Sequence, residues 1–184
     1  MTQFDSPVDD ETVVTRDQKA ASRLDWVLLC YRLPREPSTP RIAVWRRLRR
    51  LGVAQLGDGL VALPQDARTR EHLEWVAAQV EEAGGAATLW RAQTLSRADE
   101  QQVAAAIAAA RAEEYRQVIE RAGAGHEAEA SARCRLLRRL RRELRLVHRR
   151  DFFPPVERDR ATVAVEELAA SCRIDTDAAS AGSS

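Results

Sequence analysis

Arginine is the residue whose abundance and spacing suggest chemistry in this chain. Of the 29 basic residues all but one are arginine, and Lys19 is the exception. Residues 41–50 hold five arginines and no acid, and residues 131–150 hold nine arginines against one glutamate. The net charge of the chain is only +1, so these clusters predict two local positive patches that suit phosphates and other anions.

The first cluster begins beside a loop that could hold a small anion. Thr39-Pro40 is typical of a helix start, with a hydroxyl N-cap followed by proline at the first helical position. The N–H groups and the partial positive charge of a helix N-terminus attract anions. We therefore predict an anion site formed by Arg35, Ser38, Thr39 and Arg41, with Arg41 turned inward. The alternative is ordinary capping by Thr39 with solvated arginines.

The second cluster predicts a positive ridge along one helix. At about 100° per residue, five apolar side chains share one face: Leu136, Leu137, Leu140, Leu144 and Val147. Arginines line the opposite face: Arg135, Arg138, Arg142, Arg145 and Arg149. Such a ridge could follow the phosphates of duplex DNA, and its lack of aromatic residues argues against base stacking. The alternative is a solvated face, or one neutralised by a partner or by the acidic N-terminal residues.

Charged residues on inward faces of the helical half allow a third kind of site. They are Arg111, Glu114, Arg133 and Glu143. Glu114, with Tyr115 and His148, could line a polar pocket for a metal or a substrate. The alternative is one or two interhelical ion pairs, because an inward charge is costly unless it is paired. The histidines match no HxxxH or HExxH spacing and the cysteines no CxxC spacing, so metal and cofactor stay unknown.

The elements that must position these residues form two regions. Residues 23–95 alternate short apolar runs with helical patterns in the order β-α-β-β-α-β, and a Gly-Asp-Gly turn joins the middle strands. This order predicts an α+β fold, a ferredoxin-like sandwich. Its expected core includes Trp26, Leu28, Trp45 and Leu48. Residues 96–173 are predicted to form a helical hairpin plus one further helix, packed on the sandwich or on a second subunit of a homodimer.

The boundaries of these regions follow from breakers and composition. The helices of the second region are expected at 97–122, 127–150 and 156–173, separated by Gly-Ala-Gly and Pro-Pro. Residues 1–22 carry five acids without periodicity and are expected to form a disordered arm, and residues 174–184 a flexible tail. No apolar run is long enough to span a membrane, and no signal region begins the chain, so we expect a cytoplasmic protein.

Two stretches of the sequence resemble a known family. The first is Trp-Val-Leu-Leu-Cys-Tyr-Arg-Leu-Pro at 26–34, with the Pro-Ser-Thr-Pro-Arg-Ile segment and basic helix at 37–52. The second comprises Glu114-Tyr115 and the Arg-Arg-Asp-Phe-Phe that ends a helix at 149–153. Together they resemble the N-terminal domain of the chromate-resistance protein ChrB over most of residues 23–173. The first part is also similar to the middle domain of phenylacetate-operon repressors and to small ferredoxin-like CRISPR-associated nucleases.

The resemblance implies a chromate-responsive transcriptional regulator of a chromate-efflux operon, with chromate or a similar oxyanion and duplex DNA as its ligands. Residues 1–22 cannot form the helix-turn-helix of a phenylacetate-type repressor, so DNA binding would use the arginine helices. The family's further C-terminal domain has no counterpart before Ser184, so we expect a stand-alone N-terminal domain. The second hypothesis is a small enzyme or cofactor protein that uses the pocket at Glu114. We favour the regulator, since no catalytic residue set is recognisable.

Overall fold

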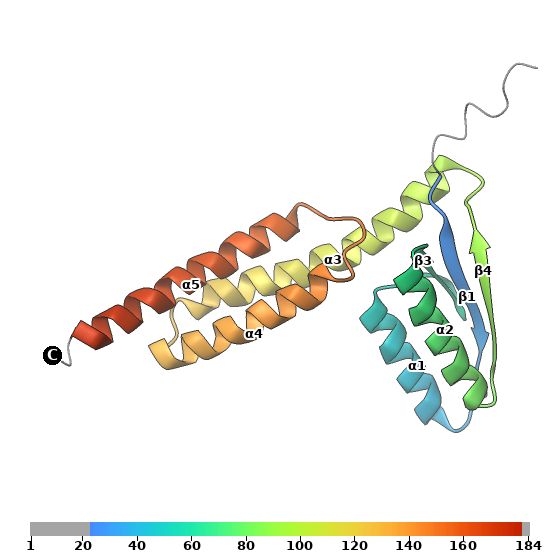
Figure 1. The fold of residues 1–184 in the computed structure, drawn as a ribbon, viewed down its shortest axis with the longest axis horizontal. Helices are drawn as coiled ribbons and strands as arrows, with labels where there is room; N and C mark the ends of the chain where they lie inside the picture. The colour runs from blue at the N-terminus through green and yellow to red at the C-terminus, as the bar shows by residue number, and fades with distance from the viewer. Residues whose placement is uncertain (1–22, 182–184) are drawn as a thin grey trace, which may run out of the picture.

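Two modules joined by one long helix make up the described chain, residues 23–181 of this computed structural model (Figure 1). The first module is a sheet with two helices, and the second is a bundle of three helices that projects from it as an arm. The N-terminal segment that was predicted to be disordered, residues 1–22, lies outside the described residues, as do the last residues of the predicted tail, 182–184.

The first module is a four-stranded antiparallel sheet covered by two helices on one face. Its elements are β1 (Trp26–Arg32), α1 (Ser38–Leu51), β2 (Ala54–Gly57), β3 (Leu60–Pro64), α2 (Ala67–Glu82) and β4 (Ala86–Ala92). The strands lie in the order β2-β3-β1-β4, and every neighbouring pair is antiparallel. This is the β-α-β-β-α-β arrangement of a ferredoxin-like sandwich, so the predicted fold class is confirmed.

The core of the sandwich follows the period of two along the strands. Val27 and Leu29 of β1 face the helices and pack on buried residues of α1 and α2. Leu48 is in this core, as predicted, at 3% exposure. Trp26 is also buried, but it faces the other side of the sheet, and half-buried Leu28 packs there with it.

The predicted burial of Trp45 is wrong, because this side chain is 49% exposed. The buried line of α1 runs through Val44 and Leu48, and Trp45 lies about 100° around the helix from Val44. The flank of α1 that it reaches has little sheet beneath it, since β2 is only four residues long with three of them exposed. The guanidinium of Arg49 covers the indole instead, 4.9 Å from the ring centroid.

The second module buries the apolar stripes of its three helices against one another. Its helices are α3 (Arg97–Gly125), α4 (Ala130–His148) and α5 (Glu157–Ala181). Tyr115 and Val118 of α3, Leu140 of α4 and Leu168 of α5 lie at the centre of the shared core, each fully buried. The hairpin therefore finds its main packing partner in α5.

Helix ends in this module differ from the predicted ones. The Gly-Ala-Gly segment does not break α3, which continues to Gly125. A Cβ on Gly125 would lie 2.8 Å from Leu136 Cδ2 and 3.1 Å from Leu168 Cδ1, so this glycine allows a close approach of three helices. Helix α5 continues past the expected end at 173 and reaches Ala181, since no glycine or proline interrupts residues 174–181.

Helix α3 belongs to both modules. Near its start, Ile107 packs on Trp26 and Ala54, on the face of the sheet opposite α1 and α2. The loop between α4 and α5 adds Phe153, whose ring centroid lies 6.1 Å from that of Trp26. Beyond this contact α3 leaves the sheet and enters the bundle (Figure 1). Within residues 23–181, no helix has both the length and the apolarity that a membrane crossing requires.

Candidate anion and nucleic-acid interface

The predicted anion site lies at the exposed start of α1. The helix begins at Ser38 with Pro37 as its N-cap, so the predicted N-cap at Thr39 is wrong. Pro37 is extended, with φ −70° and ψ 152°, which places Thr39 inside the first turn, where its side chain cannot cap. Within the described part of the chain, no side chain caps this helix, and its first turn contains no acid.

The four predicted ligands are neighbours there. Ser38, Thr39 and Arg41 follow one another in the first turn, interrupted only by Pro40. Arg41 Nη1 donates to the backbone oxygen of Arg35 at 3.5 Å, which holds the guanidinium over the loop. All four are exposed, so Arg41 points outward and not inward as expected. The backbone N–H groups of the first turn have no partner within the helix, so they are available to an anion.

The predicted ridge on α4 is fully formed. Its members Arg135, Arg138, Arg142, Arg145 and Arg149 are all exposed. On the opposite face Leu137, Leu140, Leu144 and Val147 are buried, and Leu136 is half-buried. The helical period therefore sorted this helix into an apolar and a cationic face as expected.

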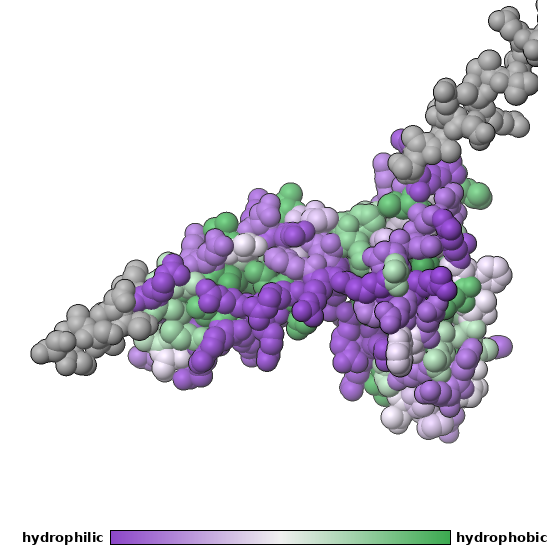
Figure 2. Space-filling view, viewed as in Figure 1, coloured by the Kyte–Doolittle hydropathy of each residue, from purple (hydrophilic) through white to green (hydrophobic). Residues whose placement is uncertain are grey.

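The two basic helices converge at the junction of the modules. Arg50, at the end of α1, and Arg149, at the end of the ridge, line one cavity of about 420 Å³, which we call the junction cavity. Arg68 of α2 and Arg150 complete its cationic wall, and His72 of α2 lies beside them. Among the described residues that line it there is no carboxylate. In Figure 2 a band of hydrophilic residues runs from the helical arm across to the sandwich at this junction.

Hydrogen bonds to helix ends hold the wall of the junction cavity in place. Arg68 Nη2 donates to the backbone oxygen of Arg149, which ties α2 to the end of α4. Arg150 Nη1 donates to the backbone oxygen of Arg50 at 3.0 Å. Arg68, His72 and Arg150 were not among the site residues predicted from the sequence. A signal was present for Arg150, because both basic helices end in an Arg-Arg pair.

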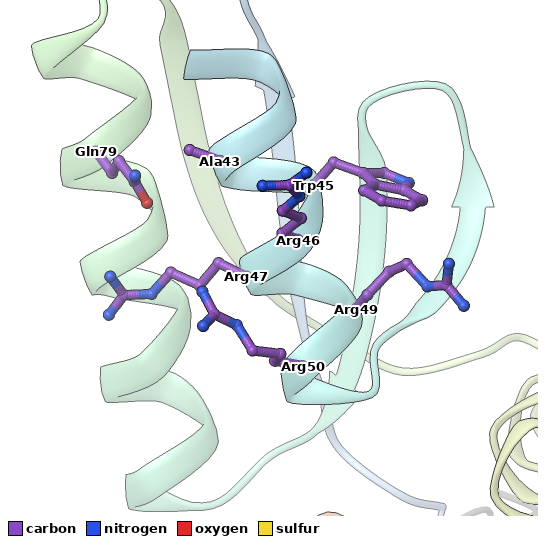
Figure 3. Close-up of a pocket in the computed structure, with 7 residues that line it drawn as sticks. All are labelled: Ala43, Trp45, Arg46, Arg47, Arg49, Arg50 and Gln79. Carbon is purple, nitrogen blue, oxygen red and sulfur yellow. The ribbon is translucent and has the colours of Figure 1, made fainter. Parts of the chain in front are cut away.

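A groove on the outer side of α1 extends this basic surface (Figure 3). Its volume is about 550 Å³, and Arg46, Arg47 and Arg50 line it together with Gln79 of α2. Arg47 points toward α2, whereas Trp45 and Arg49 lie on the other flank of α1. Arg50 lines both this groove and the junction cavity, so α1 continues the cationic surface that begins on α4.

The three residues of the predicted polar pocket do not line one common cavity in the structure. Glu114 accepts from Arg150 Nη2 at 2.6 Å and pairs with Arg111 Nη2 at 3.1 Å. It lines a cavity of about 530 Å³ together with Arg111, Glu113 and Glu143. The expectation of interhelical ion pairs fits, since Arg121 of α3 also pairs with Glu143 of α4 at 2.6 Å.

Tyr115 and His148 lie inside the bundle, next to each other, with ring centroids 5.7 Å apart. The hydroxyl of Tyr115 donates to Asp151 Oδ2 at 2.8 Å. Burial and this hydrogen bond raise the pKa of Tyr115, and burial lowers the pKa of His148, helped by the charge of Arg158. Both groups are therefore held neutral, which suits a packing role. Among the described residues, no three His, Cys, Asp or Glu side chains gather as a metal site would require.

Arg111 is a buried charged residue, at 4% exposure. Burial lowers its pKa, and the charge of Glu114 opposes this shift. Arg133 also points inward, and it donates to the carbonyl oxygens of His126 and Ala128 after the end of α3. Inward charges in this bundle thus pair with acids or with helix-end carbonyls, as their cost requires.

Comparisons with known proteins point to one family. The family model described as "Protein ChrB, N-terminal" matches residues 41–179. Among curated proteins, "Protein ChrB" of Cupriavidus metallidurans is 30% identical over 133 residues, which are 70% of this chain and 40% of the relative. The chain therefore corresponds to less than half of that relative's length. No solved structure matches.

Proposed function

The chain belongs to the family of ChrB N-terminal domains, and from this premise we propose that it is an oxyanion-responsive regulator that binds duplex DNA, with chromate as the oxyanion. The observation that carries the proposal is the convergence of two exposed arginine helices, α1 and α4, on one surface. The two anionic ligands would each have their own place, the nucleic acid on the ridge of α4 and the small ion at the start of α1.

DNA is the partner that suits the ridge on α4. From Arg135 to Arg149 the ridge extends about 21 Å along the helix axis. Each strand of duplex DNA carries one phosphate per about 3.4 Å of the duplex axis, and because the strand winds around this axis, the straight ridge can contact a few phosphates of one strand. The exposed side chains carry the contact, and the buried leucines behind them keep the helix in the bundle.

A small oxyanion suits the start of α1. Free N–H groups of the first turn, the hydroxyls of Ser38 and Thr39 and the guanidinium of Arg41 are all donors. The absence of a capping side chain among the described residues leaves these donors to a ligand. Arg35, on the loop, can close over the bound ion.

The test measures both ligands on one protein. A labelled duplex is titrated by fluorescence anisotropy at a series of salt concentrations, with and without chromate. We expect binding whose affinity falls steeply with salt, and an affinity that chromate changes at constant ionic strength. If the affinity for the duplex is the same in chromate as in sulfate, chromate-specific regulation is contradicted. If the chain does not bind the duplex at low salt, the proposal of DNA binding is contradicted.

The alternative, a small enzyme with a pocket formed by Glu114, Tyr115 and His148, has less support. Glu114 is paired with two arginines, Tyr115 lies in the bundle core, and half-buried His148 lies beside the ring of Tyr115.

A further inference from the structure

The junction cavity has the features of a small-molecule site, and it shares only Arg149 with the ridge that is proposed to bind DNA. We propose that it binds a phosphate monoester with a flat, apolar body, a small organic phosphate. This inference goes beyond the proposed function, because neither DNA binding nor an oxyanion at the start of α1 requires it.

The charge of the cavity wall selects an anion. Four guanidinium groups reach it from three directions, Arg50 from α1, Arg68 from α2, and Arg149 and Arg150 from the end of α4. His72, half-buried beside them, adds a further donor. A phosphate dianion uses several converging donors, whereas a single bidentate arginine is enough for a carboxylate. The number of arginines therefore favours phosphate.

One of these arginines is fixed by hydrogen bonds within the protein. Arg150 is fixed at both terminal nitrogens, since Nη1 donates to the oxygen of Arg50 and Nη2 to Glu114. Its Nε is buried and has no hydrogen-bond partner in the structure. Arg150 therefore serves as a fixed part of the wall, and the exposed guanidinium groups of Arg50 and Arg149 are the donors that can reach a ligand.

The size and the floor of the cavity select an organic ligand. Leu51, Leu63, Leu146 and Phe152 provide an apolar floor between the two modules. A volume of about 420 Å³ falls within the usual range for small-molecule sites and exceeds what an inorganic ion would fill. An aromatic or alicyclic body on the floor with its phosphate on the cationic wall would use both surfaces. The neighbouring cavity at Glu114 does not compete, because Glu113, Glu114 and Glu143 repel an anion there.

The test uses 1-naphthyl phosphate as the probe, titrated calorimetrically into the full chain. We expect one site per chain and much weaker binding of inorganic phosphate, which lacks the apolar body. Arg50→Ala and Arg68→Ala should each weaken the probe about tenfold or more, since each removes a charge-assisted hydrogen bond. Arg50→Ala keeps the backbone oxygen that Arg150 uses, so it tests the charge without disturbing the wall.

Two further variants distinguish the contribution of the apolar floor from that of the cationic wall. Leu146→Gln, at a side chain that is already 51% exposed, should weaken the naphthyl probe and leave inorganic phosphate unchanged. Arg70→Ala removes an exposed arginine of the same helix as Arg68 that pairs with Glu74, away from the cavity, and should change neither affinity. Melting temperatures of all variants show that each is folded.

Three results would overturn the proposal. The first is equal affinity of the probe for the chain and for Arg50→Ala and Arg68→Ala. The second is inorganic phosphate binding as tightly as the naphthyl probe. The third is full displacement of the probe by a duplex whose own affinity falls in Arg50→Ala, which would make the cavity a contact for the nucleic-acid backbone. Probe binding that persists when duplex and chromate fail to bind would separate this site from the proposed function.

Discussion

Gly52 and Arg111 meet at the junction of the sandwich and the bundle. Gly52 ends α1 with φ +76°, a left-handed conformation that glycine adopts without strain. A Cβ built on Gly52 would overlap the Nη1 atom of Arg111, a nitrogen that is buried without a hydrogen-bond partner. The glycine thus serves two purposes, since it ends the helix and makes room for a buried cation.

The first prediction distinguishes these two roles by comparing alanine substitutions at two glycines. Gly84 has nearly the same φ, +74°, but a Cβ there would meet no atom within 4 Å. Each substitution by alanine should cost roughly 1–2 kcal/mol for the left-handed conformation. Gly52→Ala should cost more than Gly84→Ala, because Arg111 must also move. Urea unfolding measures both free energies, and equal costs would show that the Arg111 side chain gives way without penalty.

The second prediction concerns the start of α1. Arg41→Ala should weaken chromate binding about tenfold or more and change the melting temperature little, because the side chain is exposed. Arg46→Ala, on the outer face of the same helix, should leave chromate affinity unchanged. Calorimetric titration of the two variants decides the matter. The same affinity in both would place the oxyanion elsewhere.

At the scale of elements, α4 shows why charge and packing can be changed independently. Its two faces are separated by the helical period, with buried leucines on one side and exposed arginines on the other. Removing ridge charges should therefore affect a partner and spare the fold.

The third prediction tests this separation with a triple variant. Replacing Arg138, Arg142 and Arg145 by alanine should lower the slope of log affinity against log salt for duplex DNA, by up to about 0.9 for each phosphate that no longer has an arginine partner. Unfolding free energy should change little, since exposed arginines contribute little to folding. A control that removes equal charge elsewhere replaces the exposed arginines Arg70, Arg91 and Arg116. If both triple variants keep the original slope, the ridge does not contact DNA.

Sequence periodicity predicted the type and order of the elements but not all of their ends. The short apolar run at 26–31 and the apolar stripe around Leu140 were sufficient to predict a strand and a helix there. Thr39 and Gly125 were misinterpreted, because capping and breaking depend on where the chain enters the helix and on what packs against it. Trp45 was predicted to be buried because it lies on the apolar face of the helix. The helical period identifies that face, but it does not show how much of the face the sheet covers.

At the scale of the whole molecule, the junction between modules was the part that no local pattern predicted. Arg50 and Arg150 are 100 positions apart, and their contact depends on the path of α3 between sheet and bundle. The sequence identified both basic helices, but the cavity between them arises only when α2 and the end of α4 are brought together. Arg68 and His72, on a helix without a basic run, could not be selected beforehand.

The fourth prediction concerns the connection between the modules. All four tryptophans lie within residues 26–90, so their fluorescence reports on the sandwich, whereas most helical signal comes from the bundle. Arg150→Ala removes the bonds to Glu114 and to the oxygen of Arg50. For the unchanged chain, the urea midpoints of unfolding measured by fluorescence and by circular dichroism should coincide. For the variant, the two midpoints should differ, because these bonds no longer join the two modules. Midpoints that shift together would show that the bonds of Arg150 are not what couples the modules.

The single long helix also has a mechanical consequence. From Arg111, where it leaves the sandwich, to Gly125 at its far end, α3 extends about 21 Å as a lever arm. A tilt of about 5° around Arg111 therefore moves the far end by about 2 Å, while the near end of the ridge, beside Arg150, stays almost still. Small changes at the pivot would then alter the angle at which the arginine ridge meets a straight partner. The distal arginines would swing while the proximal ones acted as a hinge.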